Sequence, residues 1–103
     1  MTEFQVVVIG AGPGGYLTAI KLSQLGQKVA LIENDKLGGE CLNYGCIPSK
    51  TMINTSDMYH KMSDLSTQGI EFESVKVDLE TFQTWKNSIT KKLRGGIDLL
   101  CKN

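Results

Sequence analysis

The first third of the chain alternates between short apolar runs and a glycine-rich turn. Residues 4–9 form a largely β-branched apolar run, which is typical of a strand buried in a parallel sheet. Apolar residues then recur at helical spacing from Tyr16 onward until Gly26, a residue suited to the position just after a helix. Residues 28–33 form a second apolar strand that ends on Glu33. This order predicts a βαβ unit with parallel strands and a right-handed crossover.

The remaining two thirds of the chain are predicted to be mostly helical. Residues 34–45 are expected to form a loop, and Pro48 suits the first turn of a helix that should extend to about Ser66. Residues 69–77 alternate weakly and predict an extended connection, after which Asp78 is expected to cap a last helix. The inner face of that helix is predicted to carry Leu79, Phe82, Trp85, Ile89, Leu93, Ile97 and Leu100.

Composition and charge narrow the class of protein. Eleven basic residues balance eleven acidic ones, which argues against a dedicated nucleic-acid binder. With 41% apolar and 21% charged residues, the composition is that of a globular protein. The start of the chain carries no positive charge and residues 6–9 are too short for a signal peptide or a membrane span, so we expect a cytoplasmic protein without a membrane partner. Two strands alone do not complete a doubly wound sheet, so the sequence is expected to be part of a larger domain.

A glycine fingerprint follows the first predicted strand. Gly10-x-Gly12-x-x-Gly15 has the spacing of a dinucleotide-binding turn, with a strand before it and a helix after it. Glu33 ends the second strand, where an acid hydrogen-bonds ribose hydroxyls and repels a 2′-phosphate, which disfavours NADP. The alternative is a glycine turn without a ligand, and the position of Glu33 favours the nucleotide interpretation.

Two of the three cysteines lie five residues apart. In a regular helix Cys41 and Cys46 would be separated by about 7.5 Å, more than the roughly 4.4–6.8 Å between the Cα atoms of a disulfide. A bridge would therefore need a distorted backbone, which Asn43 and Gly45 tolerate. Cys46 near a helix start, with Lys50 close by, would have a lowered thiol pKa. Two buried structural thiols and half of a metal site remain as alternatives, although no second Cys/His pair supports zinc.

The segment around these cysteines resembles a known signature. Residues 38–50, GGECLNYGCIPSK, are similar to the redox-active disulfide segment of the flavoprotein disulfide reductases. The ending CIPSK is most similar to the dihydrolipoamide dehydrogenase branch, because glutathione reductases usually carry a second lysine in place of Ser49 and mercuric reductases tend to valine in place of Ile47. Those two branches remain the alternatives within the family. The resemblance covers the whole chain, including residues 93–97.

The resemblance implies FAD as cofactor and gives each site residue a role. Cys46 would lie against the flavin as the charge-transfer thiol, Cys41 would attack the substrate disulfide, and Lys50 would lie near the flavin N5. Glu33 would bind the adenosine ribose. The implied cofactor-binding set is Gly10, Gly12, Pro13, Gly14, Gly15, Glu33, Asn34, Gly38, Gly39, Cys41 and Lys50. No metal is implied.

The resemblance also implies a domain organisation and an activity. Residues 1–103 would be the N-terminal part of an α/β, Rossmann-like FAD-binding domain, built from the βαβ unit and two further helices with an incomplete sheet. The NAD-binding and dimerisation domains would lie outside these residues. A full-length homodimer would oxidise lipoyl domains of 2-oxoacid dehydrogenase or glycine cleavage complexes, with NAD⁺ as co-substrate, whereas this segment alone would be inactive. A short non-catalytic nucleotide-binding or redox module is the alternative from a different class.

Several residues are expected to have no chemical role. His60 lies in a polar helical stretch and is predicted to be a surface residue. Cys101 is predicted to be a small buried hydrophobe, and Phe82 and Trp85 are predicted to be core aromatics. Gly95 and Gly96 lie within the helical pattern of the last segment. They predict either a place where another element packs closely against that helix or the end of the helix.

Overall fold

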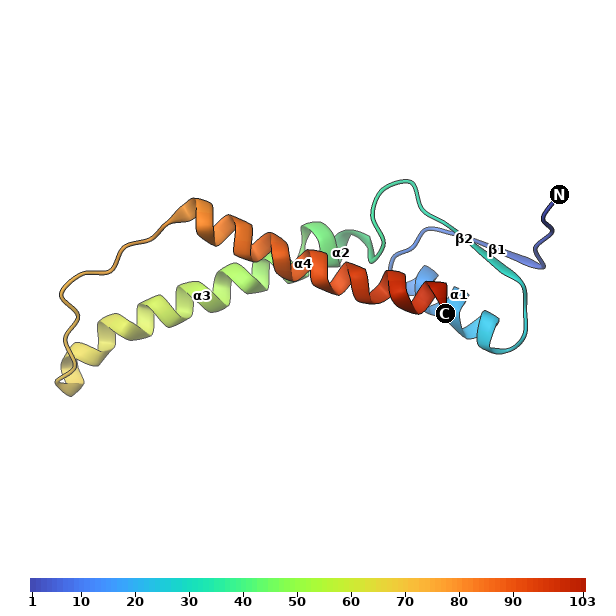
Figure 1. The fold of residues 1–103 in the computed structure, drawn as a ribbon. Coiled ribbons are helices and arrows are strands. Elements are labelled where there is room, and N and C mark those ends of the chain that lie inside the picture. The colour runs from blue at the N-terminus through green and yellow to red at the C-terminus, as the bar shows by residue number, and fades with distance from the viewer.

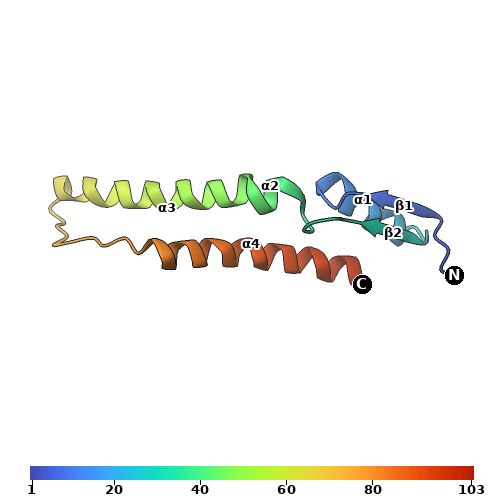
Figure 2. The same ribbon diagram turned by 90° about the horizontal axis from the view of Figure 1, so that it is seen from above.

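The computed structural model describes residues 1–103 as an elongated α/β molecule of 68 × 24 × 19 Å. Its elements, in chain order, are β1 (Val6–Ile9), α1 (Pro13–Gln24), β2 (Val29–Ile32), α2 (Gly39–Tyr44), α3 (Cys46–Asp64), a 3₁₀ turn (Leu65–Gln68) and α4 (Leu79–Lys102). The βαβ unit forms one end of the molecule, and α3 and α4 extend from it as a long hairpin (Figure 1, Figure 2). The predicted α/β class is confirmed.

The βαβ unit forms as predicted. Strands β1 and β2 pair in parallel, from Val6 opposite Val29 to Ile9 opposite Ile32, and helix α1 packs against both strands. Each strand is shorter than its apolar run. Gly26 follows α1 with φ of 85°, the left-handed conformation expected just after a helix.

The burial predicted for the first strand is wrong in these 103 residues. Ile9 is 83% exposed and Val7 is 52% exposed, because α1 covers one face of the two-stranded sheet and no other element covers the second face. Five residues are buried in all: Ala11, Ala19, Gly38, Thr90 and Ile97. The small core therefore lies where α1, α2 and α4 meet.

Helices α3 and α4 lie side by side, joined by an extended connection as predicted (Figure 2). Asp78 caps α4: its Oδ1 accepts the N–H of Thr81 at 3.1 Å, and its Oδ2 accepts the Thr81 hydroxyl at 2.7 Å. The hydrogen bond from the Thr81 side chain, followed by that from its N–H, lowers the pKa of Asp78. This predicted cap fixes the start of the helix that runs back across α2 and ends beside α1 (Figure 1).

The surroundings of single residues in α3 and α4 differ from the prediction in three cases and agree with it in one. Gly95 and Gly96 lie inside α4, and a Cβ at either would meet no atom within 4 Å, so neither close packing nor a helix end explains them. Trp85 remains 45% exposed, although its ring lies 5.9 Å from that of Phe82. Cys101 is exposed rather than buried, although it lines a hollow beside α1 and β2 that partly desolvates its thiol. His60 is exposed on α3, as predicted.

None of the helices combines the length and apolar character needed to cross a membrane.

Candidate functional site

Residues 10–15, the glycine turn, join β1 to α1 and hold the start of the helix very close to the end of the strand. Gly10 has φ of 98°, and its N–H donates to the carbonyl of Ile32 at 2.7 Å, which extends the sheet into the turn. A Cβ on Gly15 would overlap the carbonyl oxygen of Gly10 and lie 2.8 Å from its carbonyl carbon. Only glycine at position 15 lets the helix approach the strand this closely.

The N-terminus of α1 offers backbone donors without acceptors. The carbonyl of Gly12 accepts the N–H groups of Gly15 and Tyr16, each at 3.0 Å, and no side chain caps the helix. The N–H groups of Gly12 and Gly14 donate to no atom of the chain, and Pro13 has no N–H. A Cβ on Gly14 would meet nothing within 4 Å. Free donors at the positive end of a helix dipole, with open space beside Gly14, fit an anionic group such as a pyrophosphate.

The second glycine pair lies against this turn. The N–H of Gly38 donates to the carbonyl of Ala11 at 2.8 Å, and a Cβ on Gly39 would lie 2.8 Å from the Cα of Gly12. Gly38 and Gly39 both have positive φ, at 101° and 79°. The structure therefore brings the two glycine segments of the predicted cofactor set together.

Glu33 holds the glycine turn as well as ending β2. Its Oε2 accepts the N–H of Ala11 at 2.8 Å, and its Oε1 accepts the N–H groups of Asn34 at 2.9 Å and Asp35 at 3.1 Å. These bonds, the one from Ala11 first, lower the pKa of Glu33, so its carboxylate is charged at neutral pH. Three of about four acceptor positions are used, which leaves one for a ribose hydroxyl. The sequence indicated only the ligand role, because hydrogen bonds to a distant backbone leave no pattern.

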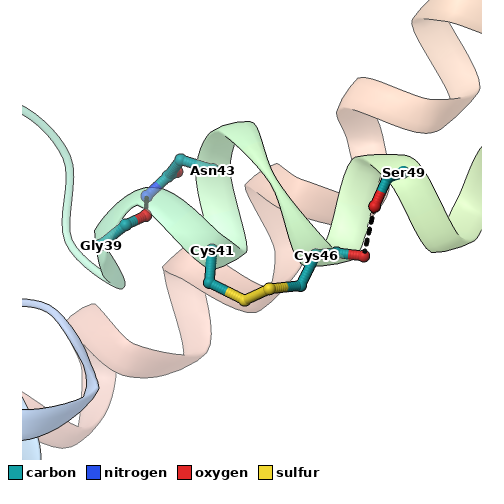
Figure 3. The surroundings of a disulfide bond; sticks show 5 residues. All are labelled: Gly39, Cys41, Asn43, Cys46 and Ser49. Atoms are coloured by element: carbon teal, nitrogen blue, oxygen red, sulfur yellow. Dashed lines mark hydrogen bonds between the residues drawn. A yellow bond between two sulfur atoms is a disulfide. The ribbon is translucent and has the colours of Figure 1, made fainter.

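Cys41 and Cys46 are joined by a disulfide across a break between two helices (Figure 3). Helix α2 ends at Tyr44, Gly45 adopts φ −128° and ψ −97°, and α3 begins at Cys46. The break brings the two Cα atoms to 4.7 Å, as the expected backbone distortion requires. The distortion lies at Gly45 alone, since Asn43 is helical. The expected loop over 34–45 is wrong at this point, because its second half forms α2.

The two bonded cysteines differ in their exposure to solvent and in their position relative to a helix. Cys41 is exposed on α2, whereas Cys46 is half-buried at the N-terminus of α3. The helix dipole favours a thiolate at Cys46, so Cys46 is the better leaving group and Cys41 the more accessible point of attack. The chain holds no group of three or more His, Cys, Asp or Glu side chains that could bind a metal, and the two thiols are bonded to each other.

Asn43 is a positioning residue that sequence analysis assigned only a tolerance for distortion. Its Nδ2 donates to the carbonyls of Leu37 at 3.0 Å and Gly39 at 2.8 Å, and Figure 3 shows its side chain on the opposite side of α2 from the disulfide. Its Oδ1 accepts Nη1 of Arg94 at 3.0 Å, from α4. Asn43 thus ties the first turn of α2 to a helix 51 residues later in the chain.

Lys50 lies one turn after Cys46 on α3 and is exposed. Its ammonium forms no hydrogen bond or ion pair within the chain. The structure thus places Lys50 on the helix that Cys46 begins, and its predicted contact with a flavin stays a prediction.

Comparisons with known proteins agree with this arrangement. Residues 4–103 match the family model described as pyridine nucleotide-disulphide oxidoreductase. The chain is 49% identical over 100 residues to a dihydrolipoyl dehydrogenase of Geobacillus stearothermophilus and 50% identical over 100 residues to one of Bacillus subtilis. It is 46% identical over 101 residues to one of Halobacterium salinarum. These matches cover 97–98% of the chain but 21% of each relative, so the chain spans about a fifth of the length of the curated relatives it matches.

Proposed function

Because the chain belongs to the pyridine nucleotide-disulphide oxidoreductase family, we propose that it supplies the dinucleotide-binding turn and redox disulfide of a dihydrolipoyl dehydrogenase. The observation that carries this proposal is the Cys41–Cys46 disulfide across the helix break, with an exposed Cys41 and a half-buried Cys46 at a helix N-terminus. A structural disulfide needs no such asymmetry, whereas thiol–disulfide exchange uses one accessible sulfur and one good leaving group.

The proposed exchange with a dihydrolipoyl group has two steps. A substrate thiolate attacks Sγ of Cys41, the Cys41–Cys46 bond breaks, and Cys46 leaves as a thiolate stabilised by the N-terminus of α3. The second substrate thiolate then attacks the substrate sulfur bonded to Cys41, which closes the lipoyl disulfide and releases Cys41. The substrate loses two electrons and two protons; the electrons reside on the two cysteines, and the protons leave to solvent or to a base outside these residues.

The residues present fit FAD. The free N–H groups of Gly12 and Gly14 would bind its pyrophosphate, and the remaining acceptor position of Glu33 would bind its adenosine ribose. Gly10, Pro13, Gly15, Asn34, Gly38 and Gly39 shape this turn and the segment against it. When bound, FAD supplies the two-electron link between the reduced cysteines and NAD⁺. Lys50 would hold a positive charge beside the Cys46 thiolate.

The proposal includes the parts expected from the family. Residues 1–103 would form the N-terminal part of the FAD-binding domain of a cytoplasmic homodimer that acts on lipoyl domains. The relatives named dihydrolipoyl dehydrogenase support this branch over a glutathione or mercuric reductase. A non-catalytic module of this length is not favoured, because the same relatives match nearly the whole chain.

A graft tests the proposal. Residues 1–103 replace the matching segment of the Geobacillus stearothermophilus relative, and NADH formation from dihydrolipoamide and NAD⁺ is measured in this grafted enzyme. We expect turnover that is lost in Cys41→Ser and Cys46→Ser, both still holding flavin, and kept in the control Cys101→Ser. A grafted enzyme that holds flavin without turnover, or that works without Cys41, would contradict the proposal.

A further inference from the structure

A polar pocket of about 490 Å³ lies where α4 passes α2 and the start of α3. Four cationic side chains line it: Lys36, Lys86, Lys91 and Arg94. No acidic residue lines it, although the chain as a whole has zero net charge. The positive charge is therefore concentrated in one concave place, which the balanced composition conceals.

The four cations have no carboxylate partners. The one salt bridge in the chain joins Lys102 to Asp98, at the far end of α4. Asp35, the neighbour of Lys36 in the chain, forms no ion pair and accepts the hydroxyl of Tyr44 at 2.7 Å. Charges gathered in a concavity without counter-charges focus an electrostatic field that attracts anions.

Two of the cations are held in place by the redox segment. Arg94 donates through Nη1 to Oδ1 of Asn43 at 3.0 Å, which leaves its other guanidinium donors free. The ammonium of Lys36 lies 5.2 Å from the ring centroid of Tyr44, within the range of a cation–π contact. Fixing these side chains before a ligand arrives reduces the entropy lost on binding.

Helix α4 supplies most of the lining residues. Lys86, Thr90 and Arg94 recur every four residues along α4, and Lys91 lies beside them. Thr90 is 9% exposed, and its hydroxyl donates to no atom of the chain, so it adds a neutral donor among the charges.

We propose that this pocket binds a small polyphosphate anion, inorganic or carried by a nucleoside. Four unpaired cations favour a ligand with several negative charges over a monocarboxylate, and the volume suits a drug-sized molecule. None of the glycines of the dinucleotide turn lines the pocket, nor does Glu33, so this site is separate from the proposed FAD site. Its nearest redox neighbours are Asn43 and Tyr44, on α2 between the two cysteines.

Calorimetric titration of the protein with tripolyphosphate tests the proposal, with ATP and acetate as comparison ligands. Losing one charge-assisted contact in Lys91→Gln is expected to weaken tripolyphosphate binding about tenfold. Lys92→Gln is the matched control. It removes the same charge at the next residue along α4, and the side chain of Lys92 does not line the pocket. Lys86→Gln gives a second, independent variant, and circular dichroism checks that each keeps its helices.

The outcomes separate a built site from general attraction. Tighter binding of tripolyphosphate than of acetate, with loss in Lys91→Gln and Lys86→Gln but not in Lys92→Gln, supports the proposal; tighter ATP binding would assign the nucleoside form. No measurable binding, equal loss in Lys92→Gln, or equal affinity for a short RNA would overturn it.

Discussion

Alanine at position 15 should destabilise the βαβ unit, whereas alanine at position 14 should not. A Cβ on Gly15 would overlap the backbone of Gly10, and neither backbone can rotate away as a side chain would. Overpacking of this kind costs about 1–3 kcal/mol, and overlap with a backbone carbonyl places Gly15→Ala near the upper end. Gly14 lies in the same turn of α1 with no atom within 4 Å of its Cβ position, so Gly14→Ala should gain up to about 1 kcal/mol of helix propensity.

The two variants are compared in the grafted enzyme by urea unfolding, followed through far-ultraviolet circular dichroism and flavin release. Both changes add one methyl group, so their difference of about 3 kcal/mol isolates the clash with Gly10. We expect Gly15→Ala to unfold at clearly lower urea than the parent. Gly14→Ala should unfold at the same or higher urea in the flavin-free form. Equal midpoints for the two variants would refute the close approach of α1 to β1.

Three further predictions concern the charged and sulfur groups. Glu33→Gln should weaken flavin retention on dialysis, since it removes the charge that holds Ala11 and the ribose; retention equal to the parent would remove that role. The lowered pKa of Glu33 means that its stabilisation is complete above the ordinary glutamate pKa of about 4.3 and is lost as pH falls through the folded value, so Glu33→Gln should flatten the acid limb of a pH–stability curve. Iodoacetamide should label only Cys101 in the oxidised protein, and slowly, because the partial desolvation of its exposed thiol raises the pKa. After reduction it should label Cys41 before Cys46, and mass spectrometry of the peptides would expose the reverse order. The 103-residue chain alone should not reduce lipoamide with NADH, because it holds a single glycine fingerprint and its one histidine is exposed on α3; activity above a heat-treated control would contradict this.

Local signals in the sequence predicted the parts of the fold that depend on neighbouring residues. The parallel βαβ unit, the left-handed Gly26 after α1 and the Asp78 cap all follow from spacing and backbone preference over a few residues. The spacing of the cysteines predicted distorted backbone between them if they are bonded, and that distortion lies at Gly45, where α2 gives way to α3. The glycine turn was predicted from its spacing between a strand and a helix, whereas the pairing of Cys41 with Cys46 was implied by the resemblance of residues 38–50 to a family signature.

Contacts between residues far apart in the chain could not be predicted from the sequence pattern. Helix α2 was missed because Gly38 and Gly39 suggest a loop, whereas the amide of Asn43 and the guanidinium of Arg94 hold that turn in place from within the fold. Burial of the first strand, of Trp85 and of Cys101 was overestimated, because an apolar pattern predicts a face that needs covering and does not say which residues cover it. The basic pocket was hidden by a net charge of zero, since charge balance says nothing about where charges lie.

The central claim, that Cys41–Cys46 is the redox centre with distinct roles for its two sulfurs, is tested most directly by absorbance after two-electron reduction. One equivalent of dihydrolipoamide is added anaerobically to the grafted enzyme and to its two cysteine variants. We predict a long-wavelength thiolate-to-flavin band in the parent. The band should be present without turnover in Cys41→Ser, where the Cys46 thiolate remains, and absent in Cys46→Ser. A band that persists in Cys46→Ser, or that disappears in Cys41→Ser while flavin stays bound, would contradict the account.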